Sequence, residues 1–172
     1  MAGVDSFEQL QKQMQSIDIY RDTPIRYLGY ANEVGEAFRS MIPSVAVKAT
    51  YVVALGYACA DALDKSRKVH KQEWNSAEER RKRVTIAAAD TFLWQALASV
   101  AIPGFTINRI CHFSNALLSK ASSLPTPIRK WVVTGIGLGT IPFIVHPIDS
   151  VVEIGMNETV RKFYNTQPEK KE

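Results

Sequence analysis

Three stretches of this chain carry almost no charged side chains, and strongly charged segments separate them. A soluble amphipathic helix interrupts its apolar residues with charge on nearly every turn, and these stretches do not. About 20 such residues in a helix are enough to cross the hydrocarbon core of a bilayer. The pattern predicts an all-α integral membrane helical bundle with about three transmembrane helices, at residues 43–63, 84–107 and 131–148.

An amphipathic helix is predicted directly before the first span. Apolar residues recur every three or four positions between Ile25 and Ile42, and Thr23 followed by Pro24 is a typical helix start. We favour a helix that lies on the membrane surface, because a hydrophobic span follows at once; packing against other helices is the alternative. The charged residues mostly face away from the apolar stripe: Arg26, Glu33, Glu36 and Arg39.

Prolines and short apolar runs define the remaining elements. We expect Pro103-Gly104 to kink or end the second span, and Pro142 and Pro147 to interrupt the third. Residues 108–124 are too few to span a bilayer, so they predict a short interfacial helix. The chain then divides into a weakly ordered segment, a single helical membrane domain and a polar tail, at residues 1–20, 21–165 and 166–172.

Charge changes the picture through its distribution, because the composition alone would suit a soluble protein. The mean hydropathy of the 172 residues is −0.10 and their net charge is +4. Nearly all of the 21 Lys and Arg residues lie outside the predicted spans, and the run Arg80-Arg81-Lys82-Arg83 abuts the second span. Such a run fixes orientation and attracts anionic lipid, so we expect no nucleic-acid partner. A soluble bundle of buried apolar helices is a further alternative.

Small residues predict where helices approach one another closely. In the first span Ala54, Ala58 and Ala62 recur every fourth position. In the third span Gly135 and Gly139 form a GxxxG pattern, which favours close contact within or between chains. No strand precedes these glycines and no acidic residue follows at the required spacing, so they do not indicate a nucleotide-binding loop.

Four ionisable residues form a predicted intramembrane polar cluster. Antiparallel threading of the spans brings Asp61, Asp90, His146 and Asp149 toward the same end of the bundle. A charged group inside a membrane is unfavourable unless it is neutral or partnered. The cluster is therefore an interhelical hydrogen-bond lock or, as the functional alternative, a proton- or ion-sensitive site.

The sequence predicts no catalytic, cofactor-binding or metal site. His146 and Asp149 lack an accompanying nucleophile motif, and no two histidines have metal-ligand spacing. We expect no enzyme, no cofactor and no small-molecule substrate.

Several blocks of the sequence resemble the mitochondrial fission process protein 1 family. The resemblance implies a multi-pass protein of the mitochondrial inner membrane that influences mitochondrial division and membrane integrity, and it implies no catalytic or cofactor residues. The matching blocks are Arg21-Asp22-Thr23, RYLGYANEVGEAFRS (26–40), Asp61 to Lys65, DTFLWQALASVAIPGFTINR (90–109), RKW (129–131) and IPFIVHPID (141–149).

These expectations leave two membrane functions open. The first is a non-enzymatic protein that shapes, divides or maintains the inner membrane, with lipids such as cardiolipin and with other membrane proteins or its own copies as partners. The second is a channel, carrier or carrier-regulating subunit, and Asp90 and the proline-interrupted spans favour it. By the positive-inside rule the basic connector 64–83 faces the matrix, which puts the N-terminus in the intermembrane space and the C-terminus in the matrix.

Overall fold

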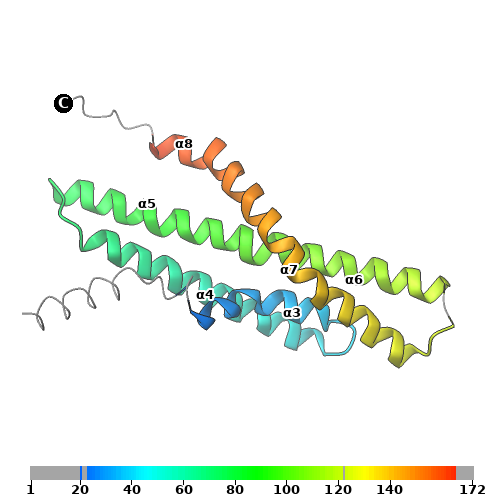
Figure 1. The fold of residues 1–172 in the computed structure, drawn as a ribbon. Helices are drawn as coiled ribbons and strands as arrows, with labels where there is room; N and C mark the ends of the chain where they lie inside the picture. Colours follow the sequence, from blue (N-terminus) through cyan, green and yellow to red (C-terminus); the bar gives the residue numbers. More distant parts are fainter. Residues whose placement is uncertain (1–19, 21–22, 122, 166–172) are drawn as a thin grey trace, which may run out of the picture.

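The computed structural model describes residues 20, 23–121 and 123–165 of the chain, and these residues are helical apart from short turns and caps. The expected weakly ordered segment 1–20 and the polar tail 166–172 lie outside the described residues, except for Tyr20. The first two long helices run side by side, and the third crosses them obliquely (Figure 1). In chain order the elements are η1 (Pro24–Tyr30), α3 (Ala31–Ala37), α4 (Ser44–His70), α5 (Ala77–Gln95), η2 (Ala96–Ala101), α6 (Ile102–Ala121), α7 (Thr126–Glu158) and α8 (Val160–Asn165).

Three long helices are apolar enough to cross a membrane, as the sequence predicts. They cover Ser44–His70, Ala77–Ala121 and Thr126–Tyr164, with mean hydropathies of 1.3, 1.4 and 1.5 in their most apolar windows. Each is longer than the 30 Å or so of hydrocarbon that a helix of about 20 residues crosses. The ends of these helices therefore extend beyond the hydrocarbon core of a bilayer.

The second long helix differs from the prediction, because it continues through Pro103-Gly104 into α6, which takes in residues 108–121 of the expected interfacial helix 108–124. The preceding segment η2 is π-helical, with an extra residue in its turn. Such a segment accommodates a downstream proline, which lacks an N–H, and frees backbone carbonyls for other donors. Within this segment, the Val100 carbonyl accepts a hydrogen bond from Asn32 Nδ2 at 2.9 Å.

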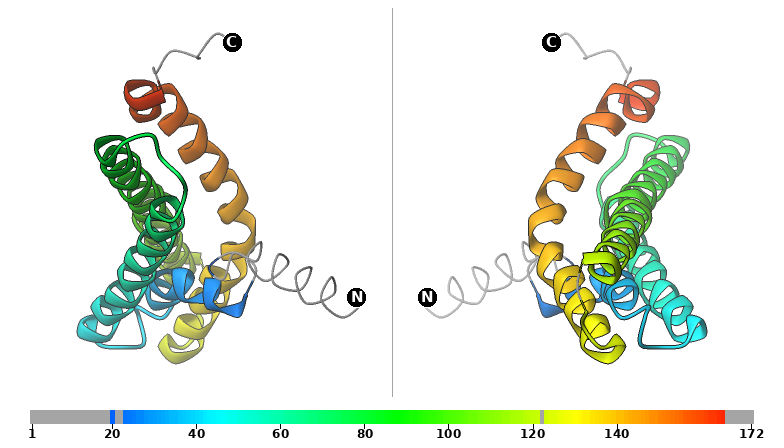
Figure 2. Two further views of the ribbon diagram at one scale, coloured as in Figure 1. Left: turned by 90° about the vertical axis from the view of Figure 1, so that its left-hand side faces the viewer. Right: turned by 90° about the vertical axis from the view of Figure 1, so that its right-hand side faces the viewer.

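The third long helix, α7, passes without a break through Pro142 and Pro147, where the sequence predicts interruptions. It packs closely against α6 and diverges from α5 toward its C-terminal end (Figures 1 and 2). The connector between the first two long helices is shorter than the predicted 64–83, because α4 continues to His70 and α5 begins after Ser76. The Ser76 hydroxyl accepts from Glu79 N at 3.1 Å and caps α5.

The predicted amphipathic helix follows the alternative of packing against other helices, not the membrane surface; Arg26 and Arg39 are exposed as predicted, but the two glutamates are not. Residues 24–37 form a 3₁₀ segment followed by the seven-residue helix α3, which packs among α4, α6 and α7. Glu33 and Glu36 point into the bundle and are 0% and 1% exposed, whereas Ile25 and Leu28 are 42% and 50% exposed. In lipid the polarity of a helix is reversed, since apolar side chains face outward and ionisable ones face the interior.

Candidate functional site: a polar interior between the helices

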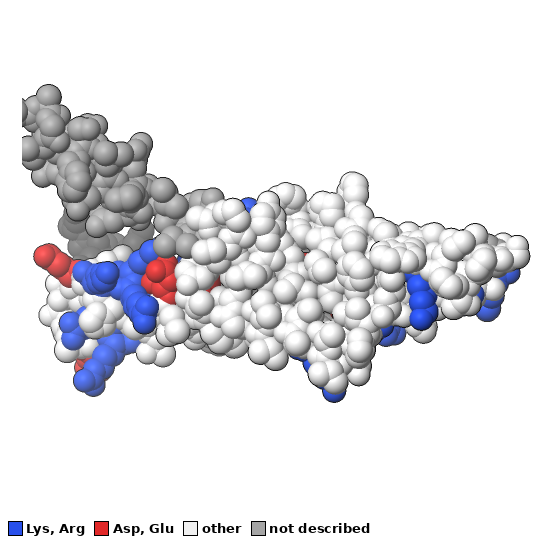
Figure 3. All heavy atoms as spheres, turned by 90° about the horizontal axis from the view of Figure 1, so that it is seen from below, with Lys and Arg blue, Asp and Glu red and all other residues white. Residues whose placement is uncertain are grey.

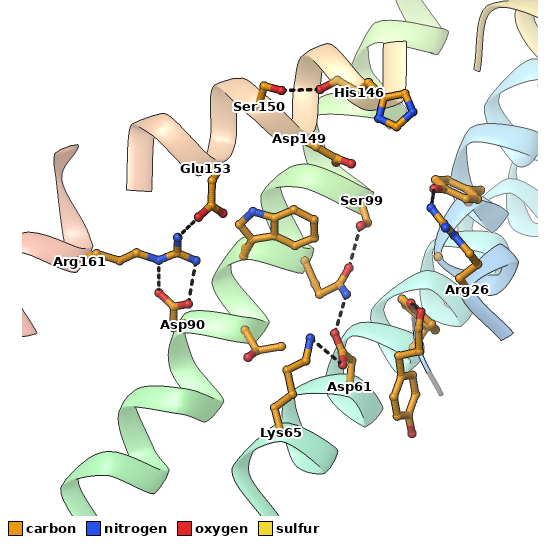
Figure 4. Close-up of a pocket in the computed structure, with 17 residues that line it drawn as sticks. Arg26, Asp61, Lys65, Asp90, Ser99, His146, Asp149, Ser150, Glu153 and Arg161 are labelled. Atoms are coloured by element: carbon orange, nitrogen blue, oxygen red, sulfur yellow. Dashed lines mark hydrogen bonds and ion pairs between the residues drawn. The ribbon is translucent and has the colours of Figure 1, made fainter. Parts of the chain in front are cut away.

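A polar cavity of about 680 Å³ lies where α7 diverges from α5 (Figure 4). The structure brings all four residues of the predicted polar cluster to its wall: Asp61 from α4, Asp90 from α5, and His146 and Asp149 from α7. Three basic residues also line the cavity, so both positive and negative side chains face it. They are Arg26, Lys65 and Arg161.

Asp61 is the buried anchor of a hydrogen-bonded chain along one side of the cavity. Its side chain is 1% exposed, and Oδ2 accepts from Gln95 Nε2 at 2.6 Å. Gln95 Oε1 in turn accepts from Ser99 Oγ at 2.7 Å. Lys65 Nζ lies 3.5 Å from Asp61 Oδ1 and supplies the opposite charge. A buried charge needs this kind of partner to be stable, so the chain ties α4 to α5 and η2.

Asp90 forms its ion pair with the C-terminal helix rather than with the other predicted members of the cluster. Arg161 Nε and Nη2, on α8, donate to the two Asp90 oxygens at 2.8 and 2.9 Å. Tyr164 also donates to Asp90, and Arg161 also pairs with Glu153 on α7. This fork connects α5, α7 and α8 at the end of the cavity where α4 meets α5 (Figure 4).

His146 and Asp149 share the cavity wall, and the geometry gives them no nucleophile. The Ser150 hydroxyl donates back to the His146 carbonyl at 2.9 Å, within its own helix. No group of three or more His, Cys, Asp or Glu side chains that could hold a metal ion occurs in the part of the chain that the structure describes. The arrangement is suited to holding water, protons or the charges of a polar ligand.

A second polar cluster surrounds Glu36 on α3. Its carboxylate, 2% exposed, accepts from Arg39 Nε at 2.6 Å, Asn108 Nδ2 at 2.7 Å and the Tyr51 hydroxyl at 2.9 Å. Burial by itself raises the pKa of Glu36, but these donors outweigh it and hold that pKa below its ordinary value. The carboxylate thereby joins α3 to α4 and α6.

Glu33, on the same helix, has the opposite environment. It is 0% exposed, and neither side-chain oxygen has a hydrogen-bond partner among the described residues. Burial, together with the negative charge of Asp149, raises the pKa of Glu33 to about 8. This carboxyl group is therefore neutral over much of the physiological pH range.

The predicted packing residues divide into two groups. Ala54, Ala58 and Ala62 are 0%, 0% and 6% exposed, so this stripe lies in the interior. Gly135 and Gly139 are exposed, and an added Cβ at either would meet nothing within 4 Å. The close contact in α7 is made instead by Gly137, whose added Cβ would lie 2.7 Å from Cys111 Sγ. A contact of Gly135 and Gly139 between chains stays a prediction.

The predicted basic patch lies on the first turns of α5. Arg80, Arg81 and Lys82 are exposed, and Arg83 is half-buried. In the view of Figure 3, Lys and Arg gather at the end of the molecule where α4 meets α5, and uncharged side chains cover the middle. A charged end beside an apolar band matches the interface between headgroups and hydrocarbon.

Sequence reasoning missed the partners Arg161 and Gln95 and the two buried glutamates. Arg161 lies 71 residues from Asp90, and no local pattern signals such a pairing. The glutamates could be found, because Asn32, Gly35 and Glu36 share one face at helical spacing. Small and polar residues on one face indicate an inward-facing stripe when the other face is surrounded by lipid.

The fold and the polar interior together define a helical membrane protein with three potential spans. The family described as "Mitochondrial 18 KDa protein (MTP18)" matches residues 14–156. The Caenorhabditis elegans protein named mitochondrial fission process protein 1 is 62% identical over 148 residues, which cover 86% of this chain and 89% of that protein. The Homo sapiens protein of the same name is 54% identical over 149 residues, which cover 87% and 89%.

This chain belongs to the mitochondrial fission process protein 1 family. The names of these relatives support a role in mitochondrial fission and a place at a mitochondrial membrane, and the family is not a known enzyme family. No solved structure matches the chain.

Proposed function

We propose that this protein acts without catalysis in the mitochondrial inner membrane, where it promotes or regulates division and inner-membrane integrity through helix–helix and lipid contacts. The observation that carries the proposal is the reversed polarity of the bundle. Phe105, Phe143 and Val151 are 65%, 78% and 66% exposed on the long helices, whereas Asp61, Glu33 and Glu36 are almost completely buried. An outward apolar surface over an ionisable interior is the arrangement that lipid favours.

Location and topology are tested together by protease protection. Mitochondria with tags on either terminus are treated with protease before and after rupture of the outer membrane, and membranes are extracted with carbonate. We expect retention in the carbonate pellet, an N-terminal tag that becomes sensitive only after rupture, and a protected C-terminal tag. Release into the carbonate supernatant, or protease sensitivity in intact mitochondria, would contradict the proposal.

A role in division is tested by rescue of cells that lack the protein. We expect the wild-type chain to restore the normal length distribution of mitochondria. A variant at the buried ion pair of the cavity, Asp61→Asn, should rescue poorly even at matched abundance in the membrane. The conservative surface variant Val52→Leu, at a position 70% exposed, is the control and should rescue fully. Equal rescue by both variants would show that the buried ion pair of the cavity is not needed for division.

Passage of ions or solutes is the second candidate function, because the cavity places acidic and basic side chains on three long helices. Charged groups around a polar space between helices are typical of transport sites. The test is ion and proton flux in vesicles reconstituted with the purified chain. Flux at the level of empty vesicles would end this alternative, whereas flux that Asp90→Asn abolishes would support it.

A further inference from the structure

The carboxyl group of Glu33 is the most unusual polar group in the described part of the molecule. It lies on α3, which is enclosed by α4, α6 and α7, and it is 0% exposed with both oxygens unpartnered. An ionised carboxylate without any hydrogen bond in such a place is strongly destabilising. Glu36, one turn later on the same helix, avoids this problem through its three donor side chains, which Glu33 lacks.

We propose that Glu33 is a proton-binding site buried between α3 and the helices packed against it, α4, α6 and α7. The proton comes from water: a hydronium ion protonates the carboxylate, which becomes a neutral carboxylic acid, and the charge of the site changes from −1 to 0. The site does not depend on the proposed function, because it rests on the burial of this one side chain.

The groups that face Glu33 determine how it titrates. Asp149 of α7 lines the cavity, and its negative charge acts on Glu33 and favours the protonated form. Tyr51 of α4 also interacts electrostatically with Glu33, although its hydroxyl donates to Glu36. On α6, Arg109 turns away to Asn108 Oδ1 and to the face of Phe105. Burial, as the larger cause, and the negative charge of Asp149 therefore favour a bound proton on Glu33.

Protonation of Glu33 makes the stability of the bundle depend on pH. The pKa of this group is raised from 4.5 to about 8 in the folded chain. The folded state therefore binds one more proton than the unfolded state between these pH values, and its stability falls as the pH rises through that window. The stabilisation is fully present below pH 4.5 and is lost above about pH 8.

Infrared spectroscopy of the purified full-length chain in detergent tests the site directly. At pH 7 we expect the C=O stretching band of a protonated carboxylic acid in the wild type, which disappears as the pH is raised through about 8. Glu33→Gln should abolish the band. The control Glu158→Gln should retain it, because Glu158 is 65% exposed and pairs with Lys162.

A second variant keeps the test independent of whether Glu33→Gln folds. Asp149→Asn removes the neighbouring negative charge, so the midpoint of the band should shift to lower pH. Equal band intensity in the wild type and folded Glu33→Gln, or a midpoint unmoved by Asp149→Asn, would overturn the proposal. Loss of the band on addition of sodium or potassium ions at constant pH would also overturn it, since the site would then bind a metal cation.

Discussion

Arg161 reaches back across the bundle and holds both carboxylate oxygens of Asp90, at 2.8 and 2.9 Å, although the two residues are 71 positions apart. The pair is only partly buried, with 17% and 22% of the two side chains exposed. It connects the C-terminal helix α8 to α5. The cavity wall is therefore completed by the C-terminal end of the third long helix.

Replacing Arg161 with Gln should destabilise the protein, because among the described residues it leaves the Asp90 carboxylate with the Tyr164 hydroxyl as its one hydrogen-bond donor. Loss of charged hydrogen bonds at a partly buried site costs about 2 kcal/mol. The measurement is the free energy of unfolding in detergent micelles by chemical denaturation. In a cycle with Asp90→Asn, the coupling energy should be about 1 kcal/mol or more.

The matched control for this prediction is Lys162→Gln, next in sequence. Lys162 pairs with Glu158, and the two side chains are 62% and 65% exposed. Exposed pairs contribute about 0.5 kcal/mol or less, so this variant should be nearly neutral. An equal effect of both substitutions would show that the fork on Asp90 does not hold α8 in place.

Tyr51→Phe should weaken the attachment of α3 to α4. The substitution removes the hydroxyl that donates to Glu36 at 2.9 Å and keeps the ring. Loss of one hydrogen bond to a buried charge costs about 1.5 to 3 kcal/mol. Tyr27→Phe is the control, because Tyr27 is 68% exposed. Thermal unfolding in micelles compares the two variants, and an equal melting temperature would contradict the role of the Tyr51 hydroxyl.

Glu36→Gln should change the acid side of the stability profile. The pKa of Glu36 is held below its ordinary value of 4.5 in the folded chain. The unfolded state therefore takes up a proton first as the pH falls, so the contribution of Glu36 is present above pH 4.5 and is lost below it. The difference in unfolding free energy between wild type and Glu36→Gln should be largest at neutral pH and should shrink on acidification. A difference that is constant with pH would exclude an ionised Glu36.

The sequence is sufficient to predict the three long apolar helices, because length and the segregation of charge alone determine them. Antiparallel threading of the spans also fixes the depths of four polar residues, so the sequence predicts that they lie toward one end of the bundle, and all four line the cavity. They are Asp61, Asp90, His146 and Asp149. The partners of these residues depend on side-chain directions across helix interfaces, which no local pattern encodes. The role of the cluster, as a lock or as a sensitive site, stays a prediction.

The N-terminal segment shows where an amphipathic pattern leads to the wrong orientation of the glutamates. A stripe of Ile25 and Leu28 opposite Glu33 and Glu36 predicts a helix on the membrane surface, with its carboxylates toward water. When the outer medium is lipid, the same stripe faces outward and the carboxylates face the interior. The choice between these orientations depends on the neighbouring helices, whose positions the segment itself does not encode.

Glycines on two helices provide a test of packing within the chain against packing between chains. An added Cβ at Gly35 would clash with the side chain of Thr50, so Gly35→Ala should destabilise the bundle by about 1 to 3 kcal/mol. Gly139→Ala meets nothing within the chain and should be neutral or slightly stabilising for unfolding. If Gly139 packs against a second copy, the bulkier Gly139→Leu should shift the chain to monomers in analytical ultracentrifugation. An unchanged mass distribution would show that the chain does not self-associate through the face of α7 that carries Gly139.

The basic patch on α5 should determine the affinity for anionic lipid. Arg81→Gln with Lys82→Gln removes two exposed charges beside the span, each of which contributes about 1 kcal/mol near an anionic surface. The measurement is binding of short-chain cardiolipin or phosphatidylcholine to the detergent-solubilised chain, by native mass spectrometry. We expect cardiolipin binding to fall about 30-fold and phosphatidylcholine binding to stay unchanged. Lys120→Gln with Lys130→Gln removes the same charge at the opposite end and is the matched control. Equal losses in the two variants would mean that net charge, rather than the patch, attracts the lipid.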